Sequence, residues 1–523
     1  MSSPPAKSLS KSTLTVMSAT LLSRILGFVR NAVVGALFGQ SWKADVLNAV
    51  FNIPFNLRKL MAEGALSTAF IPVLSRSIVQ DPSLRESKDL ARSLLSFQLV
   101  ILLPLTALCM IFAQPIISLL APFHQEYKQA LAVELFRWFI NYLVLISISA
   151  VLMAVLNAHH KFGSPAVSPI LFSISVIFFL ILLYPTWGVY AQIPGILVGG
   201  LAQILFQGYF FRRMGYSLFP KWHFWTPQLR QTVKNWFPAL SISLVSLLSQ
   251  QISISLAATL PEGSVSSMMN AIVFWQLPTG VLSASIVTVF FPRMSRQIAE
   301  NNWKGASRSM LQGLELQALL LIPVGAMMML FSEPLVALAF QRGHFTYADT
   351  QLTARILSIL SLALFTSGIF NYMQRFFFSQ NNFKTPFWTN VIWASLDIIV
   401  SIILMNTPLK VQGLAWGSAV SFFMGAIILT LLAWKKLDKK LLFNFFFFVL
   451  RCLIAIIPVV LVWHLSLAWF GTWWIHGLTF ISSLILLGEG VCALLLVLLG
   501  FLVVGIRPWR YFRAPSKEVA SDA

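Results

Sequence analysis

Four basic side chains near the start of this 523-residue chain lie inside segments that are otherwise strongly apolar: Arg24, Arg30, Arg58 and Lys59. Arginine matters chemically because its planar fork donates two hydrogen bonds to phosphate or carboxylate oxygens and keeps its proton. A charge at membrane depth is costly and usually faces a partner or a water-filled cavity. These residues therefore predict an anion-binding site in the first helical hairpin.

The composition of the whole chain predicts that lipid surrounds this hairpin. Hydrophobic residues make up 57% of the sequence and charged residues 10%, and the mean hydropathy is +0.79. These values exclude a soluble protein of this size. Because a span needs roughly 20 apolar residues, the hydropathy predicts an all-α polytopic membrane protein with fourteen transmembrane helices, over residues 13–39, 44–72, 91–112, 132–158, 166–186, 190–211, 235–258, 266–292, 310–330, 352–378, 387–405, 412–434, 446–468 and 478–505.

The formal net charge of +20 follows the topology that these helices imply. Most of the 37 lysines and arginines fall in the N-terminus, in the loops after even-numbered helices and in the C-terminus. The opposite loops hold Lys43, Lys128, Arg342 and Lys410. Because cytoplasmic loops carry the excess of positive charge, both termini are predicted to be cytoplasmic, and the basic composition requires no nucleic acid.

The chain also repeats itself at a separation of roughly 220 residues. Residues 70–76 (FIPVLSR) return as 290–296 (FFPRMSR), Pro104 matches Pro323, residues 115–119 match 334–338, residues 162–165 match 383–386, and Gly195 with Gly199 matches Gly413 with Gly417. The common order predicts two six-helix lobes. Six is even, so the lobes are parallel repeats, an arrangement in which transporters place the substrate site between the halves.

The predicted domains follow from this repeat. They are an N-terminal six-helix lobe over residues 1–220, a C-terminal six-helix lobe over 221–440, two additional transmembrane helices over 441–505 and a cytoplasmic tail over 506–523. The two additional helices have no counterpart within the repeat.

The first predicted helix carries a stripe of small or polar residues that recur every four positions: Ser23, Gly27, Asn31 and Gly35. Such a stripe allows another helix backbone to approach closely. On a helical wheel, Arg24 and Arg30 lie about 60° on either side of Gly27.

The second predicted helix has a sharper polar face. Six residues fall within about 40° of one line: Asp45, Asn48, Asn52, Asn56, Lys59 and Glu63. Arg58 lies off this line on an ideal helix, although Pro54 precedes it by one turn and distorts that angle. The face indicates a surface turned toward water or substrate.

The charges of this hairpin do not balance. Lys59 and Glu63 are spaced to pair at i and i+4, and one interpretation is that the charges snorkel to the interfaces or neutralise one another in a static bundle. Asp45 and Glu63 are too few, however, to balance four cations. The excess of positive charge suits an anionic ligand such as a pyrophosphate headgroup.

These same residues carry a resemblance to a known family. The segment 23–30 (SRILGFVR), Asp45, Pro54 and the segment 58–65 (RKLMAEGA) closely resemble the signature of the MurJ (MviN) lipid II flippases of the MOP exporter superfamily. Residues 384–386 (KTP) and 341–346 (QRGHFT) support the resemblance, as do fourteen helices instead of the twelve usual in drug-exporting relatives. The resemblance covers nearly the whole chain.

The resemblance implies two lobes around a cationic cavity and alternating access that carries lipid II, the lipid-linked peptidoglycan precursor, to the outer leaflet of the bacterial inner membrane. It implies that Arg24, Arg30 and Arg58 contact the pyrophosphate or sugar, with Ser23, Asn31, Asn52 and Lys59 beside them. Asp45 and Glu63 would shape the cavity and its gate. The additional helices would form a groove for the polyprenyl tail, and the protein would act as a monomer.

Two positions depart from the family's pattern. Asn31 stands where the family usually has an acid, and Val273 stands where it normally has an arginine. One acid and one base are lost together, so the net charge of the expected cavity is unchanged by the pair. The resemblance therefore implies a second lobe whose wall is less charged than in relatives.

Other classes of function were weighed against a lipid II flippase. A flippase for another polyprenyl-pyrophosphate-linked oligosaccharide, such as an O-antigen carrier, needs the same chemistry and is the alternative. A multidrug cation antiporter would need an acidic cavity, and a membrane glycosyltransferase would need carboxylates in a catalytic loop. The sequence predicts no enzyme, cofactor or metal site; the coupling ion stays open, as does the choice between helix packing and ion coupling for Asp397.

Overall fold

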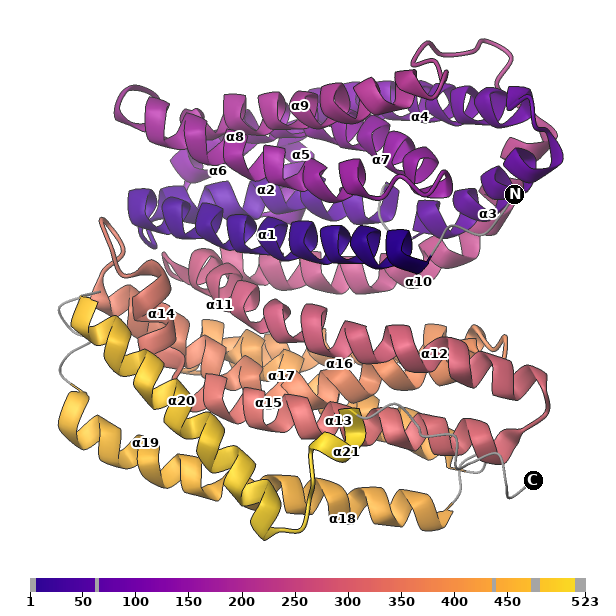
Figure 1. Cartoon of the computed structure of the whole chain (residues 1–523). Coiled ribbons are helices and arrows are strands. Elements are labelled where there is room, and N and C mark those ends of the chain that lie inside the picture. The colour runs from indigo at the N-terminus through magenta and orange to yellow at the C-terminus, as the bar shows by residue number, and fades with distance from the viewer. Residues whose placement is uncertain (1–5, 62–64, 435–438, 472–479, 513–523) are drawn as a thin grey trace. The chain divides into compact units, whose positions relative to one another are not determined.

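Helices account for nearly all of the described chain in the computed structural model (Figure 1). The structure describes residues 6–61, 65–434, 439–471 and 480–512. Within these ranges, 11 helical segments are long and apolar enough to cross a membrane. One of them, Gly163–Arg213, has 51 residues and contains two long helices.

The backbone contacts divide the chain into two compact units, residues 1–266 and 267–523. The first unit contains ten helices in its described part: α1 (Ala6–Phe38), α2 (Trp42–Met61), α3 (Ala65–Gln80), α4 (Arg85–Ile111), α5 (Ala113–Leu120), α6 (Glu126–Phe139), α7 (Tyr142–Ala158), α8 (Gly163–Trp187), α9 (Gln192–Arg213) and α10 (Pro227–Ala258). A 3-10 turn, η1 (Gly188–Ala191), joins α8 to α9. Within this unit α1 packs on α8, α8 and α7 pack on α9, and α2 packs on α6.

The second unit begins within α11 and contains the remaining elements: α11 (Ser264–Pro278), the π-helix η2 (Thr279–Ser283), α12 (Ala284–Ala299), α13 (Trp303–Leu330), α14 (Ser332–Phe340), α15 (Tyr347–Phe378), α16 (Lys384–Met405), α17 (Val411–Ala433), α18 (Lys439–Ala455), α19 (Ile457–Phe470), α20 (Phe480–Val503) and α21 (Trp509–Phe512). Here α17 packs on α15 and α16, and α18 packs on α13 and α20.

Several predicted spans consist of more than one helix. The span expected over 132–158 is formed by the end of α6 and by α7, which begins again at Tyr142. The span expected over 446–468 divides between α18 and α19, where Pro458 occupies the first turn of α19. Proline has no N–H to donate to the preceding turn, so it favours a new helix start at this point.

The repeated glycines pack neighbouring helices in each unit. A Cβ on Gly195 of α9 would lie 2.9 Å from the Cα of Val176 in α8, and a Cβ on Gly413 of α17 would lie 2.6 Å from the carbonyl carbon of Leu404 in α16. Gly199 and Gly417 also lie against these partner helices. The sequence repeat therefore corresponds to one local packing device, used once in each unit.

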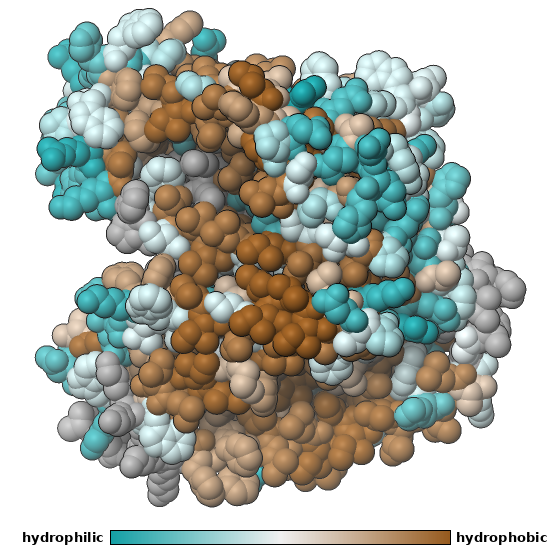
Figure 2. All heavy atoms as spheres, turned by 180° about the vertical axis from the view of Figure 1, so that it is seen from behind, coloured by the Kyte–Doolittle hydropathy of each residue, from teal (hydrophilic) through white to brown (hydrophobic). Residues whose placement is uncertain are grey.

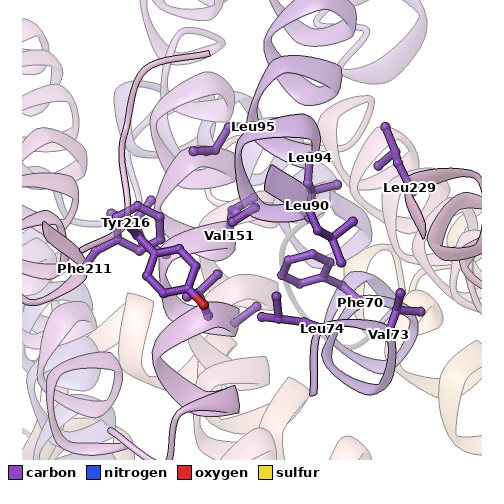
Figure 3. Close-up of a cluster of buried hydrophobic side chains, with 14 residues drawn as sticks. Phe70, Val73, Leu74, Leu90, Leu94, Leu95, Val151, Phe211, Tyr216 and Leu229 are labelled. Atoms are coloured by element: carbon purple, nitrogen blue, oxygen red, sulfur yellow. The ribbon is translucent and has the colours of Figure 1, made fainter. Parts of the chain in front are cut away.

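A cluster of buried hydrophobic side chains forms part of the core of the first unit (Figure 3). Its members come from α3, α4, α7, α9, α10 and the loop between α9 and α10, and include Phe70, Leu74, Leu90, Leu94, Val151, Phe211, Tyr216 and Leu229. Tyr216 places a hydroxyl in this cluster and donates it to Ser87 Oγ at 2.9 Å. His159 Nε2 lies 2.7 Å from the same hydroxyl. His159 therefore contributes to anchoring this cluster.

The surface carries many large apolar side chains. Figure 2 shows broad brown areas of hydrophobic side chains on one face, interrupted by teal hydrophilic ones. Exposed examples on long helices include Leu205, Phe178, Leu362, Phe423 and Leu487. Exposed apolar surface on this scale fits helices whose outer faces contact lipid.

We expect Gly413→Ala to destabilise the protein by about 1–3 kcal/mol. The new Cβ would meet backbone atoms of Leu404 and Met405 at 2.6–2.8 Å, and backbone atoms cannot rotate away. The thermal unfolding midpoint of the purified protein in detergent measures the effect. Gly488→Ala in α20 is the matched control, because a Cβ there meets no described atom within 4 Å. Equal midpoints for the two variants would contradict the packing role.

The stability of the protein should fall with acid partly through His159. Burial lowers the pKa of His159, and the positive charges of His160 and Lys161 lower it further. The unfolded chain, with an ordinary histidine pKa near about 6.5, then binds the proton more readily than the folded protein, so stability declines as the pH falls through that value.

We therefore expect the unfolding midpoint of His159→Gln to fall less than that of the wild type between pH 7.5 and pH 5.5, a window chosen around about pH 6.5. His124→Gln changes an exposed histidine and serves as the control. If the pH dependence of His159→Gln matched that of the wild type, His159 would have no part in the acid sensitivity.

Candidate functional site

The first helix brings two of the predicted arginines to the same stretch of the first unit. Arg24 and Arg30 both lie in the middle of α1, and both are half-buried. Neither forms an ion pair with a carboxylate of the described residues. The excess of positive charge expected from the sequence is therefore present at these two side chains.

The small stripe on α1 differs from its prediction at Gly27. We expected the stripe to allow close approach of another helix, but a Cβ on Gly27 would meet no described atom within 4 Å. The prediction of close packing is wrong at this residue. The absence of a side chain at Gly27 instead leaves open space on the helix face between Arg24 and Arg30.

Aromatic rings position Arg30. Its guanidinium carbon lies 5.7 Å from the ring centroid of Phe51 in α2 and 5.6 Å from that of Phe172 in α8. The two rings are nearly parallel, with an interplanar angle of 12°, and Tyr142 packs against Phe172. A cation over the face of an aromatic ring is attracted by the quadrupole of the ring. Arg30 is thus held by rings rather than by an acid.

Two further groups complete the surroundings of Arg30. Its Nη2 donates to Asn31 Oδ1 at 3.5 Å, a long contact with a neutral acceptor. Arg58 of α2 lies near enough for the two positive charges to repel, and its own guanidinium carbon lies 4.5 Å from the ring centroid of Phe55. The structure therefore places Arg30, Asn31 and Arg58 near one another.

The polar side chains of α2 have different hydrogen-bond partners at the start of the helix and further along it. Near the start of the helix, Asn48 Nδ2 donates to Ser266 Oγ at 3.3 Å. Two turns further along, Asn56 donates to Asn52 Oδ1 at 2.6 Å. Asn56 Oδ1 is buried without a partner among the described residues. Lys59 and Glu63 end the predicted line, but the side chain of Lys59 and the whole of Glu63 lie outside the described residues.

Asp45, at the start of α2, holds the N-terminus of α11. Its side chain is 4% exposed. Oδ2 accepts from the backbone N–H of Gly263 at 2.7 Å, and Oδ1 accepts from the N–H and the hydroxyl of Ser266 at 2.8 and 2.7 Å. A carboxylate at a helix N-terminus satisfies unpaired N–H groups and interacts favourably with the helix dipole.

Glu262, which precedes α11, in turn accepts a backbone hydrogen bond from the start of α2. Its Oε1 accepts from the backbone N–H of Trp42, the first residue of α2, at 2.6 Å. Its other oxygen lies 3.8 Å from Lys128 Nζ of α6. Two helix starts are thus capped reciprocally, each by an acid that belongs to the other segment. Asp45, Glu262, Trp42 and Ser266 are called the outer clasp below.

The 341–346 segment forms the turn between α14 and α15. In the 341–346 segment, Arg342 Nη2 donates to the carbonyls of Leu338 and Ala339 at the end of α14. Gly343 has a positive φ of 61°, and Thr346 forms a capping box with Asp349 at the start of α15.

Asp397 in α16 is buried and accepts from Ser418 Oγ at 3.1 Å. The Asp397 contact links α16 to α17.

Comparison with known families and proteins finds relatives that match most of the chain. A family model described as "Lipid II flippase MurJ" matches residues 34–484. A "Probable lipid II flippase MurJ" from Borreliella burgdorferi is 30% identical over 503 residues, covering 96% of this chain and 98% of the relative. Another, from Buchnera aphidicola subsp. Acyrthosiphon pisum, is 28% identical over 489 residues, covering 92% and 94%.

Solved structures give the same fold. A "Lipid II flippase MurJ, inward closed conformation" matches with a TM-score of 0.76 and 24% identity, covering 93% of this chain and 99% of that one. An inward-facing multidrug resistance MATE family transporter of the MOP superfamily matches with a TM-score of 0.68 and 15% identity, covering 81% and 97%. The prediction of an all-helical polytopic membrane fold is confirmed.

We expect Asp45→Asn to destabilise the protein by about 2 kcal/mol, because the new amide group must meet backbone N–H donors with an N–H donor of its own. Asp89→Asn is the matched control, since Asp89 forms an exposed ion pair with Lys221 that contributes less than about 1 kcal/mol. Thermal unfolding in detergent compares the two. An equal or larger loss in Asp89→Asn would contradict the capping role of Asp45.

Proposed function

Because the chain belongs to the lipid II flippase MurJ family, we propose that it carries lipid II from the cytoplasmic to the outer leaflet of the bacterial inner membrane by alternating access. Arg24, Arg30 and Arg58 bind the pyrophosphate or the adjoining sugar. Ser23, Asn31, Asn52 and Lys59 line the same site. The protein works as a transporter and not as an enzyme.

The observation that carries this proposal is the unbalanced positive charge on α1. Arg24 and Arg30 form no ion pair with a described carboxylate, and Arg58 adds a third positive charge close to Arg30. Repulsion between arginines in a low-dielectric setting makes an empty site unfavourable and a dianionic ligand favourable. A pyrophosphate supplies both negative charges and acceptors for bidentate hydrogen bonds.

The environment of Arg30 supports a binding role over a packing role. A guanidinium held by the rings of Phe51 and Phe172 keeps N–H donors available for a ligand, whereas a carboxylate partner would occupy them. Open space beside Gly27 gives the ligand room on the same helix face. Phosphate oxygens placed there would meet donors from either side.

We assign the gate to Asp45 and Glu63. The outer clasp is the described part of this gate, because Asp45 joins the start of α2 to the start of α11 through three hydrogen bonds. Access from the outer face requires these bonds to break, and access from the cytoplasm lets them form. Differential contacts of this kind are what a ligand needs to shift a conformational equilibrium.

The finer architecture proposed from the sequence accompanies this function. It comprises fourteen transmembrane helices, two six-helix parallel lobes, two additional helices over 441–505 and cytoplasmic termini. Lipid II and membrane lipid are the partners, and the unit of function is a monomer that needs no nucleic acid. The apolar exposed faces of α18 to α20 suit contact with a polyprenyl tail or with lipid.

A flippase for an O-antigen carrier lipid is the second candidate, because a polyprenyl pyrophosphate offers the same anion. The names of the family and of the relatives favour lipid II. Reconstitution in vesicles with labelled lipid II or with a labelled O-antigen carrier separates the two. Transport of the O-antigen carrier alone would overturn the assignment of substrate.

We expect Arg24→Ala and Arg30→Ala each to abolish rescue of a strain depleted of its lipid II flippase. Each variant removes charge-assisted hydrogen bonds worth about 1.5–3 kcal/mol apiece, which corresponds to at least a tenfold loss of affinity. Arg24→Lys should rescue partially, since it retains the charge but not the fork. Rescue is scored by growth, with protein level measured by immunoblot.

Lys304→Ala, at an exposed lysine in the first turn of α13, is the matched control and should rescue fully. Normal growth of the Arg24→Ala strain at wild-type protein level would remove the arginine from the binding site.

A further inference from the structure

A polar pocket of about 430 Å³ lies in the second unit, at the starts of α15 and α17 and next to α14. Its lining includes Glu333, Gln351, Arg355, Gln412 and Trp416. The topology predicted from charge places these helix starts at the outer face of the membrane. The pocket contains none of the residues assigned to substrate binding or to the gate.

The pocket contains an acid and a base that do not neutralise each other. Arg355 is exposed and forms no ion pair with any carboxylate of the described residues. Glu333 Oε1 accepts from the hydroxyl of Tyr347 at 2.6 Å, a bond that orients the carboxylate. Two separate and opposite charges on one concave wall match a ligand that carries both.

Exposed apolar side chains lie about two turns beyond the pocket on α15 and α17. Leu362 lies seven residues after Arg355 on α15, and Phe423 lies seven residues after Trp416 on α17. Seven residues are about two turns, or about 10 Å, and return to nearly the same helix face. Both side chains are 51% exposed, and α15 packs directly on α17. A lipid with a charged headgroup and two apolar chains would fit the polar pocket and the apolar side chains beyond it.

In the first unit, the repeat-related position on α9 lines an apolar pocket, so the fold does not require polar residues at this position. The offset of about 218 residues that relates Gly195 to Gly413 also relates Val198 to Trp416. Val198 lines a pocket of about 500 Å³ whose other walls include Leu103, Leu145 and Leu201. The repeat-related position is thus an aliphatic residue in an apolar pocket of one unit and a tryptophan in a polar pocket of the other, so the fold itself does not require the polar lining.

We propose that this pocket binds the headgroup of a zwitterionic aminophospholipid of the outer leaflet, with its phosphate at Arg355, its ammonium at Glu333 and its acyl chains over Leu362 and Phe423. An arginine fork suits a phosphate, and a carboxylate accepts the hydrogen bonds of a primary ammonium. The site is separate from the transport site, so the proposal does not rest on the proposed function.

Native mass spectrometry of the purified full-length protein tests this, with palmitoyl-oleoyl phosphatidylethanolamine and phosphatidylglycerol titrated separately. The wild type should bind the ethanolamine lipid more tightly. Arg355→Ala should weaken binding of both lipids by about tenfold. Glu333→Gln should weaken the ethanolamine lipid by roughly fivefold and leave the glycerol lipid unchanged, because only the former has an ammonium.

Arg137→Ala is the matched control, since it removes an exposed arginine at the end of α6 that lies outside the pocket, and it should leave both affinities unchanged. The proposal is overturned if Arg355→Ala binds the ethanolamine lipid as the wild type does. It is also overturned if the wild type prefers the glycerol lipid, or if Glu333→Gln affects both lipids equally. Arg355 is exposed, so its truncation leaves no buried cavity, and an unchanged thermal midpoint verifies folding.

Discussion

Positive charge without a matching acid is the constraint on which the first unit depends. In a low-dielectric site an unpaired guanidinium loses the hydration that it has in water. The structure compensates for this loss at Arg30 with aromatic rings, which attract a cation without filling its hydrogen-bonding positions. The rings therefore stabilise the guanidinium where the described residues supply no carboxylate partner.

The polar face of α2 divides into two parts with different physical roles. Asp45 and Asn48, at the start of the helix, bind the segment that begins α11. Asn52 and Asn56, deeper in the helix, bond to each other. A continuous polar stripe in sequence therefore serves a helix-end contact and a separate hydrogen-bonded pair. Both parts lie on α2, and Pro54 interrupts the backbone hydrogen bonding of that helix between Asn52 and Asn56.

The sequence predicted the helical membrane fold and the gathering of Arg30, Asn31 and Arg58, because apolar periodicity and intramembrane charge are local signals. It did not predict Glu262, whose partner Trp42 is 220 positions away along the chain, nor the rings around Arg30, which come from α2 and α8. Aromatic residues are common in membrane helices, so spacing alone does not distinguish these two. The interruptions between α6 and α7 and between α18 and α19 were also missed, since continuous hydropathy conceals a helix break.

Comparing repeat-related residues in the two halves of the chain distinguishes positions needed for helix packing from positions that differ between the halves. Gly195 and Gly413 each face the backbone of a neighbouring helix at less than 3 Å from a hypothetical Cβ, and a larger residue would push the pair apart. Such positions have no freedom to vary. By contrast, Val198 and Trp416 occupy related positions on the same faces of α9 and α17 and differ in size and polarity. Packing therefore fixes the helix pairs, while the side chains exposed between those fixed points are free to acquire different ligands in each half.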